Sequence, residues 1–296
     1  MKITLAILLI ILTSSTFAQD YKFDYDKLCQ EDKRAELLPL LKEWEQNKPD
    51  DPELYVAYFN YYFQESKQEV IQLSDTPGQG DNLKLTDSLG NESGYMYGKI
   101  HYQDSLFNLG IEYVDKGLSK HPRRLDMYFG KIYVLREKGN IKEYVSEIIK
   151  VIELHKNKKS NWLWSNNEPV EDGDDLFKGS IQSYCYALFN LEETYIKGIE
   201  MISKKMMLLY PNDVENYSNL GVCKLINKEY KEALETFLQA KEINPTDTIV
   251  LANIAYAYMQ LNEKENSLSY YKKVSDLGNE QEKAFANQQI KLLEKQ

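Results

Sequence analysis

The chain has 296 residues, of which 43% are hydrophobic, and its 46 acidic and 36 basic side chains give a formal net charge of −10. This hydrophobic fraction is sufficient for packed structure, and the length suits an elongated repeat protein better than one compact core. Because the longest basic cluster is Lys156-Asn157-Lys158-Lys159, so acidic a chain would be repelled by duplex DNA, and no nucleic-acid partner is expected.

Residues 1–18 have the composition of a secretory signal peptide. A positive start at Met1-Lys2 is followed by an apolar run from Ile3 to Leu12, and Thr16-Phe17-Ala18 places small residues before a cleavage point. We expect cleavage after Ala18 and an exported mature chain, either periplasmic or secreted. The apolar run is shorter than the ~20 residues that span a bilayer, so we expect no transmembrane segment in the mature chain; the alternative is a retained interfacial anchor.

Residues 19–156 have apolar residues at helical spacing, which predicts degenerate helix pairs. A loop is expected near 76–93, where Gly, Asp and Asn are frequent. The positions that predict the helices are Leu37, Leu41 and Trp44 before Pro49, then Tyr55, Tyr58, Phe59 and Tyr62, then Tyr97 and Gly98 with Gly110, Val114 and Gly117 before Pro122, and finally Phe129, Gly130 and Tyr133 with Tyr144, Ile148 and Val151.

Residues 157–177 interrupt this pattern and predict an insert. The insert contains Trp162 and Trp164, followed by the acidic run Glu168 to Asp175. A Trp pair on a protruding loop could be a binding hot spot or could stack on sugar rings. The favoured alternative is that both tryptophans fold back against the helices. The acidic run has oxygen ligands for Ca²⁺ but does not match the helix-loop-helix calcium pattern.

Residues 178–296 have the most regular spacing, with Pro211 and Pro245 placed 34 residues apart. The intervening positions suit two closely packed helices, because small residues allow close approach and large ones fill the surrounding space. Counted from Val214 as position one, these are Tyr217 at four, Leu220 at seven, Gly221 at eight, Ala233 at twenty, Phe237 at twenty-four, Ala240 at twenty-seven and Pro245 at thirty-two. This segment resembles the tetratricopeptide repeat family, and the chain as a whole resembles exported tetratricopeptide proteins of Gram-negative bacteria.

The resemblance implies an all-α solenoid of helix-turn-helix repeats, and Glu280 to Glu294 is expected to be a C-terminal capping helix. Cys185 and Cys223 fall in the first helices of neighbouring repeats. They could form a disulfide, but buried free thiols are the favoured interpretation.

The resemblance also implies a concave groove lined by the first helices. A mostly apolar groove would suit a peptide or protein partner. The candidate groove residues are Ser218, Val222, Leu225, Ile226, Ala252, Tyr256 and Met259. The groove lacks the Lys and Asn pair with which family members clamp a C-terminal carboxylate.

No catalytic motif, metal-ligand spacing or phosphate-binding loop stands out in the sequence, so neither enzymatic activity nor a cofactor is expected. The favoured function is a protein-binding adaptor in the cell envelope. The alternative is a small-ligand or glycan-binding protein that uses Trp162 and Trp164.

Overall fold

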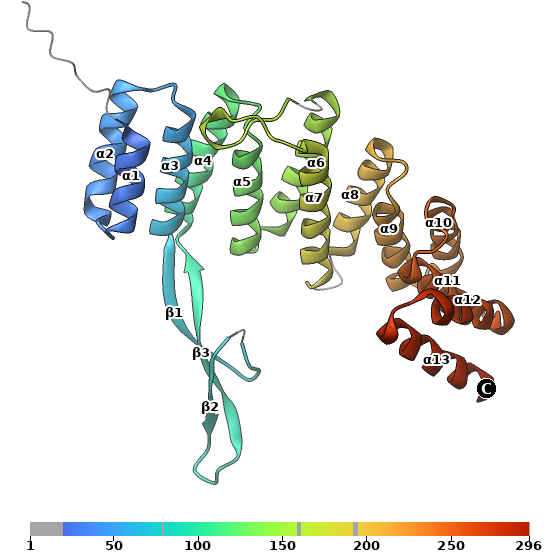
Figure 1. Ribbon diagram of the computed structural model, residues 1–296. Coiled ribbons are helices and arrows are strands. Elements are labelled where there is room, and N and C mark those ends of the chain that lie inside the picture. The colour runs from blue at the N-terminus through green and yellow to red at the C-terminus, as the bar shows by residue number, and fades with distance from the viewer. Residues whose placement is uncertain (1–19, 79, 159–160, 192–194, 296) are drawn as a thin grey trace, which may run out of the picture. The chain divides into compact units, whose positions relative to one another are not determined.

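The computed structural model describes residues 20–78, 80–158, 161–191 and 195–295 (Figure 1). The expected signal peptide, residues 1–18, lies outside the described residues. The chain divides into two compact units, which meet in the sequence between Pro122 and Arg123. In the part of the chain that the structure describes, none of the helices combines the length and hydropathy needed to cross a bilayer.

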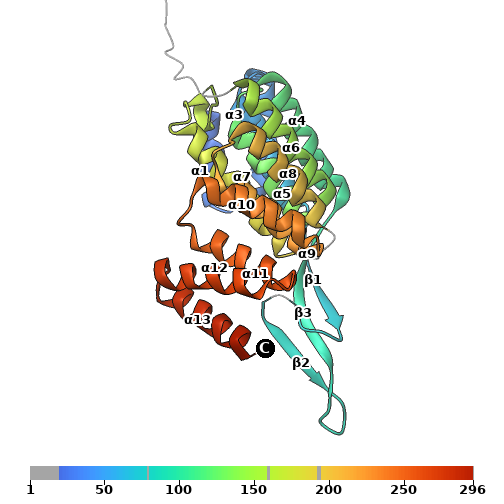
Figure 2. The same cartoon turned by 90° about the vertical axis from the view of Figure 1, so that its right-hand side faces the viewer.

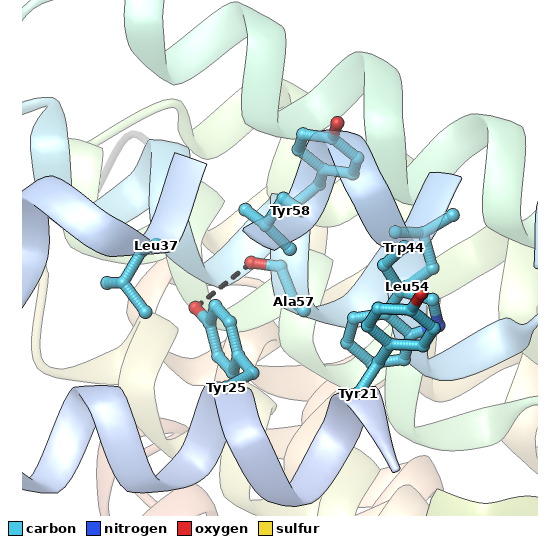
Figure 3. Packing of buried hydrophobic residues seen from close by; sticks show 8 residues of the cluster. Tyr21, Tyr25, Leu37, Trp44, Leu54, Ala57 and Tyr58 are labelled. Carbon is cyan, nitrogen blue, oxygen red and sulfur yellow. Dashed lines mark hydrogen bonds between the residues drawn. The ribbon is translucent and has the colours of Figure 1, made fainter. Parts of the chain in front are cut away.

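The described residues of the first unit form the helices α1 (Tyr21–Gln30), α2 (Arg34–Asn47), α3 (Pro52–Glu65) and α4 (Asp104–Lys120). Asp20 and Asp51 cap α1 and α3, because each carboxylate accepts a hydrogen bond from a backbone N–H of the first turn. The helix pattern predicted from Leu37 to Tyr62 is confirmed. The core of these helices consists of Tyr21, Tyr25, Leu37, Leu41, Trp44, Leu54, Ala57 and Tyr58 (Figure 3). Within it, Tyr25 Oη donates a hydrogen bond to the carbonyl of Ala57 at 3.1 Å.

A three-stranded antiparallel sheet is inserted between α3 and α4 (Figure 1). Its strands are β1 (Lys67–Ser74), β2 (Asn82–Thr86) and β3 (Glu92–Tyr102), in the order β1-β3-β2. This corrects two expectations: the loop near 76–93 contains β2 and the start of β3, and Tyr97 and Gly98 lie in a strand and not in a helix. The segment from Pro49 to Pro122 holds one helix pair, α3 with α4, around this long insertion.

The second unit is a succession of helix pairs, which confirms the predicted helical-repeat architecture. The pairs are α5 (Leu125–Lys138) with α6 (Ile141–Lys158), α7 (Gly173–Phe189) with α8 (Ile196–Leu209), α9 (Val214–Ile226) with α10 (Tyr230–Ile243), and α11 (Thr248–Gln260) with α12 (Lys264–Leu277). The insert is shorter than the predicted 157–177, because α6 runs to Lys158 and α7 already begins at Gly173. A short 3-10 turn, Ser165–Asn167, lies within it.

The last two pairs share local details 34 residues apart. Asp213 and Asp247 both cap a first helix, and Lys228 and Asn262 both adopt a left-handed conformation that ends it. The predicted capping helix is present as α13 (Glu280–Lys295), which buries Ala286 and Leu293 against the residues around Tyr271. Apolar surface that the last repeat would otherwise expose is therefore covered.

Candidate partner-binding groove

The predicted groove residues lie on two first helices, α9 and α11, but they divide between two apolar clusters. Val222 and Leu225 pack against the cluster around Phe237. Ala252 and Met259 pack against the cluster around Tyr271. Ser218 is half-buried, whereas Ile226 and Tyr256 are exposed. The seven residues thus do not share one apolar cluster.

One hollow of about 400 Å³ contains two of the predicted residues, Ala252 and Tyr256. It lies between α11, α12 and α13, which are neighbours at the C-terminal end of the second unit (Figure 2). Its lining is Thr248, Ile249, Ala252, Asn253, Tyr256, Tyr271, Val274, Gln281, Glu282 and Phe285. Ser218, Val222, Leu225, Ile226 and Met259 do not line it.

The most exposed apolar side chains of this hollow are Ile249 on α11 and Phe285 on α13. The ring of Tyr256 is 39% exposed, and Tyr271 is buried beneath. Phe285 was missed in the sequence, because α13 was expected only to cover the last repeat. Phe285 and Ala286 are consecutive, and consecutive residues of a helix face different sides. The sequence alone could therefore have shown that Phe285 does not share the side of α13 that Ala286 buries.

A single carboxylate is fixed at the edge of the hollow. Glu282 accepts hydrogen bonds from Thr248 Oγ1 and from the backbone N–H of Asn279, both at 2.7 Å. These bonds, chiefly that from Thr248, lower the pKa of Glu282. Burial raises the pKa of Tyr271 to about 12, so its phenol stays neutral. The hollow thus combines an apolar floor with one permanent negative charge, a set of groups suited to holding an apolar side chain of a peptide.

The two tryptophans of the insert have different environments. Trp162 is 2% exposed, and its Nε1 donates a hydrogen bond to Nδ1 of His155 at 2.7 Å. Trp164 is 38% exposed and lies edge-on to Phe129. Trp162 therefore folds back against the helices, as the favoured interpretation of the sequence predicted. A buried ring offers no face on which a sugar could stack.

A buried polar cluster anchors the insert. His155 is fully buried on α6, and its ring stacks on Phe177 at a centroid distance of 3.8 Å. His155 Nε2 lies 2.7 Å from Tyr210 Oη and 3.1 Å from Asp174 Oδ1. An imidazole, a carboxylate and a hydroxyl within hydrogen-bond distance of one another could relay a proton, but this imidazole has no surface that a substrate could reach. We interpret the cluster as a clamp that joins α6, α7 and the segment after α8.

The two buried cysteines are free thiols. Cys185 and Cys223 are free and buried, so the disulfide alternative is not formed. Burial raises the pKa of each thiol to about 12. Cys29 is also free but exposed.

Comparison with known proteins places the repeat in the same part of the chain as this hollow. Residues 214–247 and 250–277 match the family described as Tetratricopeptide repeat. No curated protein matches the sequence.

Several solved structures are distantly similar. The crystal structure of MamA is 15% identical with a TM-score of 0.38, over 57% of this chain and 87% of that one. The C-terminal part of a TPR repeat-containing protein from Cytophaga hutchinsonii is 14% identical with a TM-score of 0.43, over 86% and 78% of the two chains. YrrB, described as a TPR protein with an unusual peptide-binding site, is 15% identical with a TM-score of 0.39, over 84% and 97%.

Proposed function

Because this chain is a tetratricopeptide-repeat protein, we propose that it is an exported adaptor that binds a peptide segment of another protein in the hollow between α11 and α13. Such repeats are in general interaction scaffolds and not catalysts, which supports a binding role. The observation that carries the proposal is the hollow of about 400 Å³ with the exposed rings of Tyr256 and Phe285 at its rim. Exposed aromatic side chains beside a pocket are the residues on which binding energy concentrates.

The ligand that fits best is an extended or helical peptide with one apolar anchor residue. Ile249, Ala252 and Val274 offer only hydrocarbon to the anchor, while Glu282 can accept a hydrogen bond from a donor beside it. The charge of Glu282 disfavours a peptide with an acidic residue next to the anchor. The glycan-binding alternative gains no support, because Trp162 is buried.

The binding proposal is tested with peptides or proteins captured from the native cell envelope by mild crosslinking and identified by mass spectrometry. We expect Tyr256→Ala and Phe285→Ser each to raise the dissociation constant of the captured partner at least tenfold. Leu208→Ser is the matched control, since Leu208 is 85% exposed on α8 and does not line the hollow. Folded variants that both bind as tightly as the control would exclude this hollow as the binding site.

Export rests on the composition of residues 1–18 and is tested separately. Expression of the full chain in a Gram-negative host, followed by N-terminal sequencing of the envelope fraction, should give a chain that begins at Gln19. A cytoplasmic chain that still begins at Met1 would contradict it.

A further inference from the structure

The inserted sheet of the first unit has one exposed apolar face. Leu73, Met96 and Leu83 lie side by side across its three strands, as the register shows. Ile71 and Ile100 extend this row toward the helices, because residues two or four positions apart share a face of a strand. Ile71 is 75% exposed, Leu73 67% and Leu83 58%. Contiguous apolar surface of this kind marks an interaction site on a soluble protein.

The opposite face is partly covered by the chain's own loop. The backbone at Gly78 lies so close to the ring of Tyr97 that a side chain there would overlap it. Asn82 holds this loop in place, since its Oδ1 accepts from Gly78 N at 2.7 Å and its Nδ2 donates to Gly78 O at 3.0 Å. The loop therefore covers the ring of Tyr97 on this face.

The two edges of the sheet differ in how they are protected. The edge strand β2 has five residues and an irregular register after Leu85, features that discourage further pairing. The edge strand β1 has eight residues in unbroken register with β3, contains no proline, and pairs with no other strand among the described residues. A long, regular edge of this type is a template for an added strand.

We propose that β1 pairs antiparallel with β1 of a second copy of this chain, about a two-fold axis at Ile71. The product is a six-stranded sheet with one continuous apolar face. Its strand order is β2-β3-β1-β1-β3-β2. This surface is separate from the groove of the second unit, so the pairing does not depend on the proposed peptide binding.

Charge complementarity selects both the second copy and the register. Centring the axis on Ile71 places Lys67 of each copy opposite Asp75, the residue that directly follows β1, of the other. Two ion pairs would then close the ends of the paired strands. Centring it on Glu69 would oppose two carboxylates, and centring it on Gln72 would oppose Glu69 to Asp75. Centring it on Val70 would oppose both Lys67 and Glu69 to apolar residues. Centring it on Gln68 would also oppose Lys67 to Glu69, but it would pair only residues 67–69 of each β1 strand. The register centred on Ile71 therefore combines opposite charges with pairing along nearly the whole strand.

The connection of β1 to the helices permits this pairing. Strand β1 follows α3 after a single residue, Ser66. In an antiparallel pair the two α3 helices therefore lie at opposite ends of the new strand pair.

Sedimentation equilibrium of the full chain across the micromolar range tests the proposal. We expect a concentration-dependent dimer for the wild type. Lys67→Glu and Asp75→Lys should each raise the dimer dissociation constant about tenfold or more, because each replaces two attractive pairs by two repulsive ones. The double variant Lys67→Glu/Asp75→Lys should restore it to within about threefold, because the charges are exchanged and remain complementary.

The rescue separates pairing from simple damage, because Lys67 also places its ammonium 4.4 Å from the ring centroid of Phe63. Loss of that contact would persist in the double variant, whereas loss of the ion pairs would not. A wild-type chain that stays monomeric overturns the proposal. This holds even if β1 pairs with a strand of another protein instead. The proposal is also overturned if both single charge reversals leave the dimer dissociation constant unchanged, or if the double variant does not restore it.

Crosslinking checks the two-fold axis directly. In a Cys29→Ser background, Ile71→Cys should form a disulfide-linked dimer under mild oxidant, because directly opposed residues have Cβ atoms within disulfide reach. Leu89 is 85% exposed in the β2–β3 turn, so Leu89→Cys is the matched control and should form no disulfide-linked dimer. Equal crosslinking of both variants would place the contact elsewhere.

Discussion

At the scale of single residues, one buried side-chain hydrogen bond helps to hold the insert against α6. Trp162→Phe removes the N–H that donates to His155 Nδ1 but keeps an aromatic ring in the same site. We expect it to lower the free energy of unfolding by about 1–3 kcal/mol, because the buried acceptor loses its donor. Trp164→Phe should change this value by about 0.5 kcal/mol or less. Urea denaturation followed by circular dichroism measures both, and equal effects would mean that Trp162 does not anchor the insert.

The three thiols give a second prediction at this scale. Cys185 and Cys223 are buried and their pKa values are raised to about 12, whereas Cys29 is exposed. At about pH 8 we expect a disulfide reagent to label Cys29 in the folded chain and all thiols in urea. Because the folded pKa values lie above the unfolded ones, the two buried thiols should also make the free energy of unfolding fall as pH rises above about 9. Rapid labelling of the native Cys185 or Cys223 would contradict their burial.

At the scale of helices, close approach within a repeat depends on Gly221. A Cβ at this position of α9 would overlap the ring of Phe237 on α10. Gly221→Ala should therefore lower the free energy of unfolding by about 1–3 kcal/mol, as overpacking does. Gly179→Ala on α7 is the matched control, since a Cβ there meets open space. We expect it to raise stability by about 0.5–1 kcal/mol. Thermal or urea unfolding measures both changes in the free energy of unfolding. Stabilisation by Gly221→Ala would show that the two helices can move apart without loss of stability.

At the scale of the whole molecule, the sheet is an addition to a complete helix pair. Gln103 N donates to Ser66 O at 2.7 Å, and Lys67 lies opposite Tyr102, so the ends of the insertion already meet. Replacing residues 68–101 by an Asn-Gly turn should preserve the helical circular dichroism and cooperative unfolding. The shortened chain should also lose its self-association. Loss of helical signal would show that α3 and α4 need the sheet to fold.

The repeated helix pairs could be predicted from the sequence alone. The spacing of their Gly, Ala, aromatic and Pro positions reflects contacts between helices that are close in the chain. The capping residues Asp213 and Asp247 likewise act within one turn. Helical periodicity and proline spacing are local properties, so they can be recognised without coordinates.

The remaining features become visible only in the folded structure, because they depend on contacts between distant segments. Strand β3 contains Gly94 and Gly98, which weaken its alternation, and its pairing with β1 is not visible in either segment alone. The direction of Trp162 follows from His155 on α6 and Tyr210 after α8. The hollow at Tyr256 exists because α13 brings Phe285 to the opposite rim. In each case the decisive partner lies on another element, where periodicity carries no information.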